Sequence, residues 1–186
     1  MHGVTSLFQR LESEHRSLSE ALDVFERYLA RAVAGTGDLF DLPRFAVFFR
    51  DFVHLHHERE ERILLPALAR REFSLERGPL RHIREEHLRE NVLLDELFAI
   101  VFRRGGCTPD DPALIAAAQA FIQFERSHIA KETHHLYPAA KTALVNDTGR
   151  LDDEVARFDG DRAAYSCIAW TERVLGELSA TYPLPS

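Results

Sequence analysis

Several features are scarce in this sequence of 186 residues, and each scarcity excludes a class of protein. There are only two cysteines, Cys107 and Cys167, and they form no CxxC motif and no disulfide framework. No segment approaches the roughly 18 unbroken apolar residues that a membrane-spanning helix needs. Basic residues are outnumbered, and the formal net charge of −7 argues against nucleic acid or anionic membranes as partners. The first residues lack the basic and apolar regions of a secretory signal, so we expect a cytoplasmic protein.

What the sequence does contain is helical periodicity almost throughout, with no strand signal. Apolar side chains at helical spacing predict four long helices and two in the tail, over residues 5–34, 43–71, 78–104, 112–144, 152–158 and 161–180. Thr5 or Ser6 can cap the first helix, and Gly35 can end it. Pro66 and Pro138 lie inside the second and fourth helices and should kink them.

The first two long helices repeat 72 positions later, and the repeat retains residue types that bind metals. The polar and proline positions shared by both copies are His15/His87, His56/His128, Glu60/Glu132 and Pro66/Pro138. An apolar frame repeats around them, whereas the surface residues differ. A repeat that served packing alone would keep the apolar positions and let the polar ones drift, so these shared polar positions indicate a common chemical task.

Two helix pairs with short loops predict an all-α, antiparallel up-and-down four-helix bundle built from a duplicated helical hairpin. Helices rise about 1.5 Å per residue, so the first and second His of each copy should lie at similar depth in the bundle. We expect residues 1–146 to form this bundle. Residues 147–186 have no counterpart in the repeat, and we expect a C-terminal helical extension that packs on the bundle or joins a homodimer.

The spacing also predicts that the polar side chains converge. In each copy the second His and the Glu are four residues apart and therefore share a helix face. Four imidazoles and two bridging carboxylates suit two divalent ions, and mixed nitrogen and oxygen donors favour iron, with zinc or manganese as alternatives. One HxxxE pair alone is more often a surface ion pair, but six buried polar side chains without partners would be costly. The expected ligands are His15, His56, Glu60, His87, His128 and Glu132.

At these residues the chain resembles the hemerythrin-like (HHE cation-binding) domain. The matching text is Glu14-His15, the HHEREE run that begins at His56 and leads to Pro66, the segment 78–87, and the segment 128–138. The resemblance covers about residues 7–144 and implies a non-haem di-iron centre, bridged by oxide or hydroxide, on the six ligands above. The oxygen-carrying hemerythrins have a further His four residues after the third-helix ligand. Here that position is Asn91, which argues against dedicated oxygen transport.

Several positions leave alternatives open. Glu90 and His135 replace apolar residues of the first copy on the metal-facing stripe, so each is a candidate additional ligand. His57 with Glu61 is an alternative register for the second-helix pair, although the repeat favours the pair one residue earlier. The remaining histidines are expected to be solvated or to support the ligands from outside: His54, His82 and His134.

Three functions fit this prediction. The favoured one is a metal-binding module whose di-iron centre binds dioxygen or nitric oxide, or holds iron, as a sensor or scavenger. The second is a di-iron enzyme in nitrosative or oxidative stress defence that repairs iron–sulfur clusters or handles peroxide, with Tyr137 as a proton donor. The third is a bundle whose metal only stabilises the fold. The sequence favours a binding module over an enzyme without deciding between them.

Overall fold

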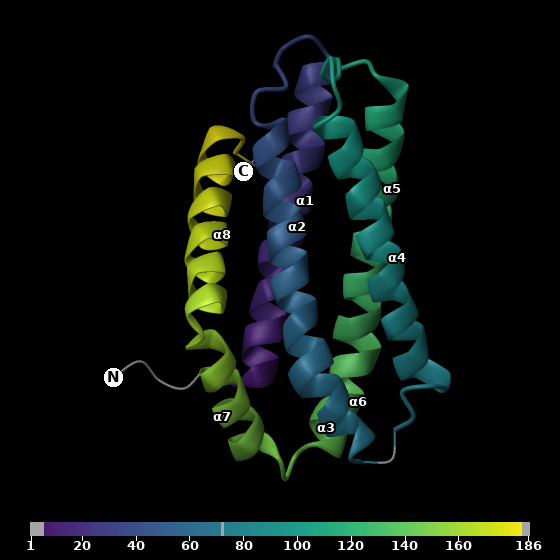
Figure 1. The fold of residues 1–186 in the computed structure, drawn as a ribbon, viewed down its shortest axis with the longest axis vertical. Helices are drawn as coiled ribbons and strands as arrows, with labels where there is room; N and C mark the ends of the chain where they lie inside the picture. Colours follow the sequence, from purple (N-terminus) through teal and green to yellow (C-terminus); the bar gives the residue numbers. More distant parts are fainter. Residues whose placement is uncertain (1–5, 72, 184–186) are drawn as a thin grey trace.

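The computed structural model describes residues 6–71 and 73–183, and within these ranges every regular element is helical (Figure 1). The four rods of the bundle are α1 (Leu7–Val33), α2 (Leu42–Arg59) with η1 (Glu60–Leu64) and α3 (Leu65–Ala69), α4 (Gly78–Val101), and α5 (Pro112–Lys131) with η2 (Glu132–Leu136) and α6 (Tyr137–Ala143). Two further helices, α7 (Thr148–Asp159) and α8 (Arg162–Thr181), follow and form a C-terminal arm. Neighbouring rods contact each other in a ring of α1, α2, α4 and α5, which confirms the predicted all-α bundle.

Local sequence signals set where the helices begin and end. The hydroxyl of Ser6 accepts a hydrogen bond from the backbone N–H of Gln9, and the side-chain oxygen of Gln9 accepts one from the backbone N–H of Ser6, which is a capping box. Thr5, the other predicted cap, lies outside the described residues. Asp111 caps α5 through the backbone N–H of Ala113. Gly35, with φ of 72°, occupies the left-handed region just after α1, as expected for a helix stop.

The predicted kinks at the two internal prolines take the form of π-helical turns. The backbone N–H of Leu65 donates to the carbonyl of Glu60, five residues earlier, and Tyr137 repeats this contact with Glu132. A proline that follows such a residue has no N–H and its ring crowds the carbonyl four residues back, so a wider turn relieves the conflict. Both predicted ligand carboxylates therefore lie at the first residue of a π-helical turn.

The core consists of two apolar clusters separated by a polar layer. The larger cluster lies towards the loops that join α1 to α2 and α4 to α5, and it contains Phe25, Phe45, Phe49 and Phe121, all 0% exposed. The smaller cluster lies towards the other end of the bundle and contains Leu11, Leu64 and Ala140. The two copies of the repeat place their histidines and glutamates in the layer between these clusters. The apolar clusters therefore separate this layer from water at both ends of the bundle.

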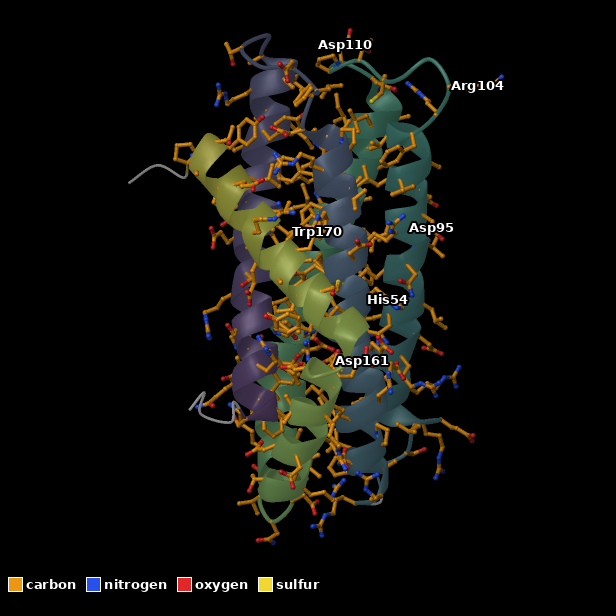
Figure 2. All side chains as sticks on the ribbon, turned by 60° about the vertical axis from the view of Figure 1, so that its left-hand side comes forward. His54, Asp95, Arg104, Asp110, Asp161 and Trp170 are labelled. Atoms are coloured by element: carbon orange, nitrogen blue, oxygen red, sulfur yellow. The ribbon has the colours of Figure 1, made fainter. Side chains whose placement is uncertain are left out.

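The C-terminal arm packs on its own bundle. α8 contacts α2 and α1, and α7 contacts α1 and η1. Figure 2 shows α8 crossing obliquely in front of α1 and α2, with Trp170 on its length, and the Trp170 ring packs against the larger apolar cluster. This arrangement accounts for the apolar face of the tail, and the homodimer stays a prediction. No helix of the described residues is long and apolar enough to cross a membrane.

Candidate metal centre

The polar layer holds two adjoining groups of buried donor side chains. The first group contains His15, His56 and Glu132, and the second contains His57, Glu60, His87 and His128. Within each group the candidate ligand atoms lie within 4.8 Å of one another, which is close enough for one ion to reach them all. These side chains come from α1, α2, η1, α4, α5 and η2, so every rod of the bundle contributes. All are buried, and the most exposed, His57, is only 7% accessible.

Each carboxylate lies between the two groups. Oε2 of Glu132 is 3.1 Å from Nε2 of His15, while its Oε1 is 3.4 Å from Nε2 of His128. Oε2 of Glu60 is 3.3 Å from Nε2 of His87 and 3.8 Å from Nε2 of His56. The two oxygens of Glu132 face opposite groups, and Oε2 of Glu60 faces one histidine of each group. Both carboxylates could therefore bridge two ions.

The imidazoles are oriented by contacts on their outward nitrogens. The Nδ1 partners are Thr133 Oγ1 for His15 at 2.9 Å, Glu14 Oε2 for His56 at 2.9 Å, Glu61 Oε1 for His87 at 3.0 Å and Glu86 Oε2 for His128 at 3.1 Å. A carboxylate oxygen can only accept, so three of these rings carry their proton on Nδ1. When these rings are neutral, their Nε2 atoms point at the interior with a lone pair, which is the arrangement that metal-binding histidines need.

The structure brings together all six residues predicted from the repeat, and it adds a seventh. His57 joins the second group, and its ring stacks on that of His87 with centroids 3.9 Å apart and an interplanar angle of 17°. The repeat could not reveal it, because the matching position in the second copy is Ile129. Its place on the apolar stripe, four residues after Val53 and three before Glu60, was the signal available in the sequence.

The alternatives left open by the sequence separate clearly. Glu61, in the other register, is partly exposed and supports His87 from outside. Glu90 is 0% exposed, and its Oε2 lies 3.0 Å from Nε2 of His57, so it borders the second group. His135 is exposed, because the C-terminal arm that covers the equivalent Ile63 covers only the first copy. Three other histidines, His54, His82 and His134, are exposed as expected.

A second buried carboxyl, Glu125 of α5, lies beside Glu90. Burial raises the pKa of Glu90, and burial together with the charge of Glu90 raises the pKa of Glu125 well above its usual range. Their counterparts in the first copy are Leu18 and Val53, so the second copy contributes two buried carboxyls at positions where the first copy is apolar.

Unpartnered atoms provide a direct test of whether a metal fits this layer. Among the described residues, the buried side-chain atoms without a hydrogen-bond partner, apart from the Tyr28 hydroxyl, belong to His57, Glu60, His87, Glu90, Glu125, His128 and Glu132. In addition, Nε2 of His15 and Nε2 of His56 face each other at 3.2 Å. A buried polar atom left unpaired costs about 1–3 kcal/mol. Cations that accept these lone pairs would remove the cost, so the donor set fits a metal centre.

The protein's own carboxylates hold protons on the imidazoles. Burial opposes protonation of His87, but the adjacent carboxylates of Glu132 and Glu60 outweigh it and raise its pKa to about 12. Burial likewise opposes protonation of His128, but the charge of Glu132 and the hydrogen bond with Glu86 raise its pKa to about 9. A cation must therefore displace protons to bind here, because only neutral imidazole is a ligand.

We expect the affinity for divalent metal to rise with pH. Both pKa values lie above 8, so between about pH 6 and 8 both imidazoles are protonated before binding and deprotonated after it. Burial also opposes protonation of His56, but the carboxylates of Glu60, Glu132 and Glu14 outweigh it and raise its pKa well above its usual value. At least two protons are then released per chain, and the affinity should rise at least about a hundredfold per pH unit. Calorimetric titration with Zn²⁺ in buffers of different ionisation enthalpy measures the release directly. A binding constant that is independent of pH would contradict this electrostatic description.

The fold and this layer define a class: four-helix bundles that hold a non-haem metal centre with inward His and Glu from facing helices. A scan against family models gives a match to the hemerythrin HHE cation binding domain over residues 6–140, and the chain belongs to this family. No curated protein and no solved structure matched the chain. The C-terminal arm lies beyond the matched residues.

Proposed function

We propose that the two groups together hold two iron ions. The ligands are His15, His56, Glu60, His87, His128 and Glu132, with His57 as a seventh donor. Mixed imidazole and carboxylate donors favour iron over Mg²⁺ or Ca²⁺, which prefer oxygen, and leave zinc or manganese as alternatives. The unpartnered buried nitrogens and oxygens are the observation that supports this assignment most strongly.

The proposed role of the centre is to bind a small diatomic ligand, dioxygen or nitric oxide, as a sensor or scavenger. An iron pair would supply the electrons and the open coordination position that such binding requires. The first group has three donors where the second has four, so the side at His15 and His56 is the one with room for a ligand. This difference between the two groups is the observation behind the proposed diatomic site.

Tyr137 places a hydrogen-bond donor at the same side. Its hydroxyl donates to Oε1 of Glu60 at 2.8 Å and lies 3.0 Å from Nε2 of His15. Burial and the charges of Glu60 and Glu132 raise the pKa of Tyr137 well above its usual value, so the phenol keeps its proton. A protonated hydroxyl in this position can hydrogen-bond a polar ligand that enters beside His15.

Two surface hollows reach the centre from different faces. One, of about 620 Å³, is lined by His15 together with Arg16, Ile129 and Thr133. The other, of about 510 Å³, is lined by His57, His87 and Asn91. Asn91 is the position at which oxygen-carrying hemerythrins have a further His. Small molecules can thus approach both groups, but the group that contains His57 has four donors and so leaves less room for a further ligand than the group of three.

The test of the proposed function is optical. Protein loaded anaerobically with ferrous iron should contain about two irons per chain. Its absorption spectrum should change reversibly on exposure to dioxygen or nitric oxide, and azide should shift the spectrum of the oxidised form. Protein that holds two irons but shows no spectral response to any of the three would contradict the diatomic role.

His57→Ala tests the seventh donor. Loss of one imidazole from the second group should weaken binding of one of the two ions by at least about tenfold and leave the other nearly unchanged. Metal titration of the stripped protein measures this. The control is His54→Ala, which removes an exposed imidazole from the same helix and should leave both affinities alone. If the two variants bind metal equally well, His57 is not a donor.

A second candidate function is an enzyme of oxidative or nitrosative stress defence, and the position of Tyr137 favours it. A hydroxyl that keeps its proton beside the proposed open position could deliver that proton to peroxide or to a reduced nitrogen oxide. Tyr137→Phe removes this hydroxyl, together with its contacts to Glu60 and His15, and keeps the ring. If it abolishes peroxide turnover by the iron-loaded protein while iron content is unchanged, the enzyme is the better description. If no turnover is found in the wild type, the binding module is.

A further inference from the structure

A line of buried contacts connects the C-terminal arm to a side chain of the centre. Nδ1 of His56 lies 2.9 Å from Oε2 of Glu14 on α1. The other oxygen of Glu14 accepts a hydrogen bond from Nη1 of Arg59. Nη2 and Nε of Arg59 donate to Oδ1 of Asp159 at 2.9 and 3.1 Å. Asp159 is the last residue of α7, so the arm reaches His56 through two intervening side chains.

The middle of this connection is shielded from water, whereas Asp159 at its outer end is 20% exposed. The guanidinium of Arg59 is 0% exposed and lies 4.9 Å from the centre of the Phe158 ring. Arg10 of α1 holds the other oxygen of Asp159, with Nη2 to Oδ2 at 2.7 Å, so Asp159 is fixed from both sides. A buried guanidinium needs all of its charge partners, because an uncompensated charge inside a protein is strongly destabilising. Without Asp159, Arg59 would keep its contact with Glu14 but lose the contact that ties it to the arm, and both side chains would be free to move.

The duplicated hairpin provides an internal comparison. Glu86 and Lys131 are 72 positions after Glu14 and Arg59. Oε2 of Glu86 lies 3.1 Å from Nδ1 of His128, and Lys131 donates to the other oxygen of Glu86. The Lys131 side chain, however, is 40% exposed, and no carboxylate of the arm contacts it among the described residues. The arm thus covers Arg59, which supports His56 through Glu14, whereas Lys131, which supports His128 through Glu86, is open to solvent.

We propose that Asp159 is a positioning residue for the first donor group, and that through Arg59 and Glu14 it fixes the ring orientation and tautomer of His56. The proposal rests on the proposed metal function in that it takes His56 as a ligand. Because coupling between two sites is reciprocal, metal in the first group also stabilises the docked arm. The arm is thereby a part of the metal centre rather than an appendage, although it lies outside the residues that the family model matches.

The test uses full-length protein stripped of metal and titrated with Co²⁺, whose visible absorption reports each binding step. Asp159→Asn keeps the volume and removes the charge. It should weaken one binding step by about 10- to 100-fold and change the other by less than about threefold. Asp159→Glu, which restores the carboxylate, should recover most of the loss.

The matched control is Asp152→Asn on the same helix. Oδ1 of Asp152 accepts a hydrogen bond from the backbone N–H of Leu7 at 3.3 Å, so this residue docks α7 on α1 without touching Arg59. It should leave both binding steps unchanged. Lys131→Met, the comparable change in the second half, should not weaken the step that Asp159→Asn weakens. If Asp159→Asn fails to fold, Arg59→Lys provides the same test, because it retains the charge but loses the two-point contact with Asp159.

A second readout separates this proposal from the metal function itself. In the stripped protein, at a pH high enough for the imidazoles to be neutral, ¹⁵N spectra should show one tautomer of His56 in the wild type and a mixture in Asp159→Asn, with His128 unchanged. If the wild type binds no metal but His56 responds in this way, the positioning role stands and the metal function fails. If Asp159→Asn alters neither His56 nor either binding step, or if Asp152→Asn has the same effect, the proposal is overturned.

Discussion

Replacement of Glu132 by glutamine should abolish binding of both metal ions. Its two oxygens face opposite groups, at 3.1 Å from Nε2 of His15 and 3.4 Å from Nε2 of His128. A neutral amide of the same volume can offer one weak oxygen donor but no charge, so two cations would be left with Glu60 as the one bridging carboxylate. Metal content after loading and desalting should fall from about two ions per chain to well below one. Elemental analysis of the purified variant measures this.

Two comparisons make the Glu132 result interpretable. Glu132→Ala should have the same effect, which separates loss of the ligand from any effect of the introduced amide. Ser19→Ala removes a hydroxyl that donates to the backbone carbonyl of His15 at 2.7 Å without facing the donor groups, and it should retain full metal content. A Glu132→Gln protein that folds and keeps both ions would show that this carboxylate does not bridge them.

Removal of metal should lower the thermal stability of the wild type by a large amount. A ligand present at about 1,000 times its dissociation constant stabilises the folded state by about 4 kcal/mol, so two ions contribute roughly 8 kcal/mol. For a chain of this length, each kcal/mol corresponds to about 2–4 °C in the unfolding midpoint. A strong chelator should therefore lower the midpoint by roughly 15–30 °C, as followed by calorimetry.

The same measurement has an internal control. The Glu132→Gln protein should unfold at nearly the same temperature with and without chelator, because it holds no metal to lose. If chelation moves the wild-type midpoint by less than about 3 °C, the ions contribute little to the folded state, and the cost of the unpartnered buried atoms must be met in another way.

The sequence predicted the fold and six donor positions because both follow from periodicity. Helical spacing places His56 and Glu60 on one face, and the offset of 72 selects the same positions in the second copy. The observed layer contains all six. The start of the first helix also followed from local chemistry, at Ser6, whereas α7 begins at Thr148, four residues before the predicted start at residue 152.

The features that the sequence did not predict are those in which the two copies differ. His57 has Ile129 as its counterpart, so a search for shared polar positions rejected it. His135 was placed on the inward stripe by analogy with Ile63, but Ile63 is buried by the arm and the second copy has no such cover. The support of His56 by Asp159 depends on how the arm docks, and no spacing rule relates two residues 103 positions apart. Asymmetry in a duplicated fold comes from tertiary packing, which the repeat does not encode.

The two donor groups differ in ways that suggest different roles for their ions. The second donor group has the extra imidazole of His57, is bordered by the buried carboxyls Glu90 and Glu125, and has an outer support at Lys131 that is open to solvent. The first donor group has three donors, a protonated Tyr137 hydroxyl beside them, and an outer support that the arm covers. We infer that the second donor group holds its ion firmly. The ion in the first donor group keeps an open position for a ligand, and the arm and Tyr137 modify the properties of that position.

The most direct test of the central claim is anomalous diffraction from a crystal grown with iron. Data collected on either side of the iron absorption edge should show two peaks per chain. One should lie between His15, His56 and Glu132, and the other between His57, Glu60, His87 and His128, with both carboxylates reaching both peaks. A single peak elsewhere on the molecule, or a bundle interior without any peak while these side chains hydrogen-bond only one another, would contradict the account.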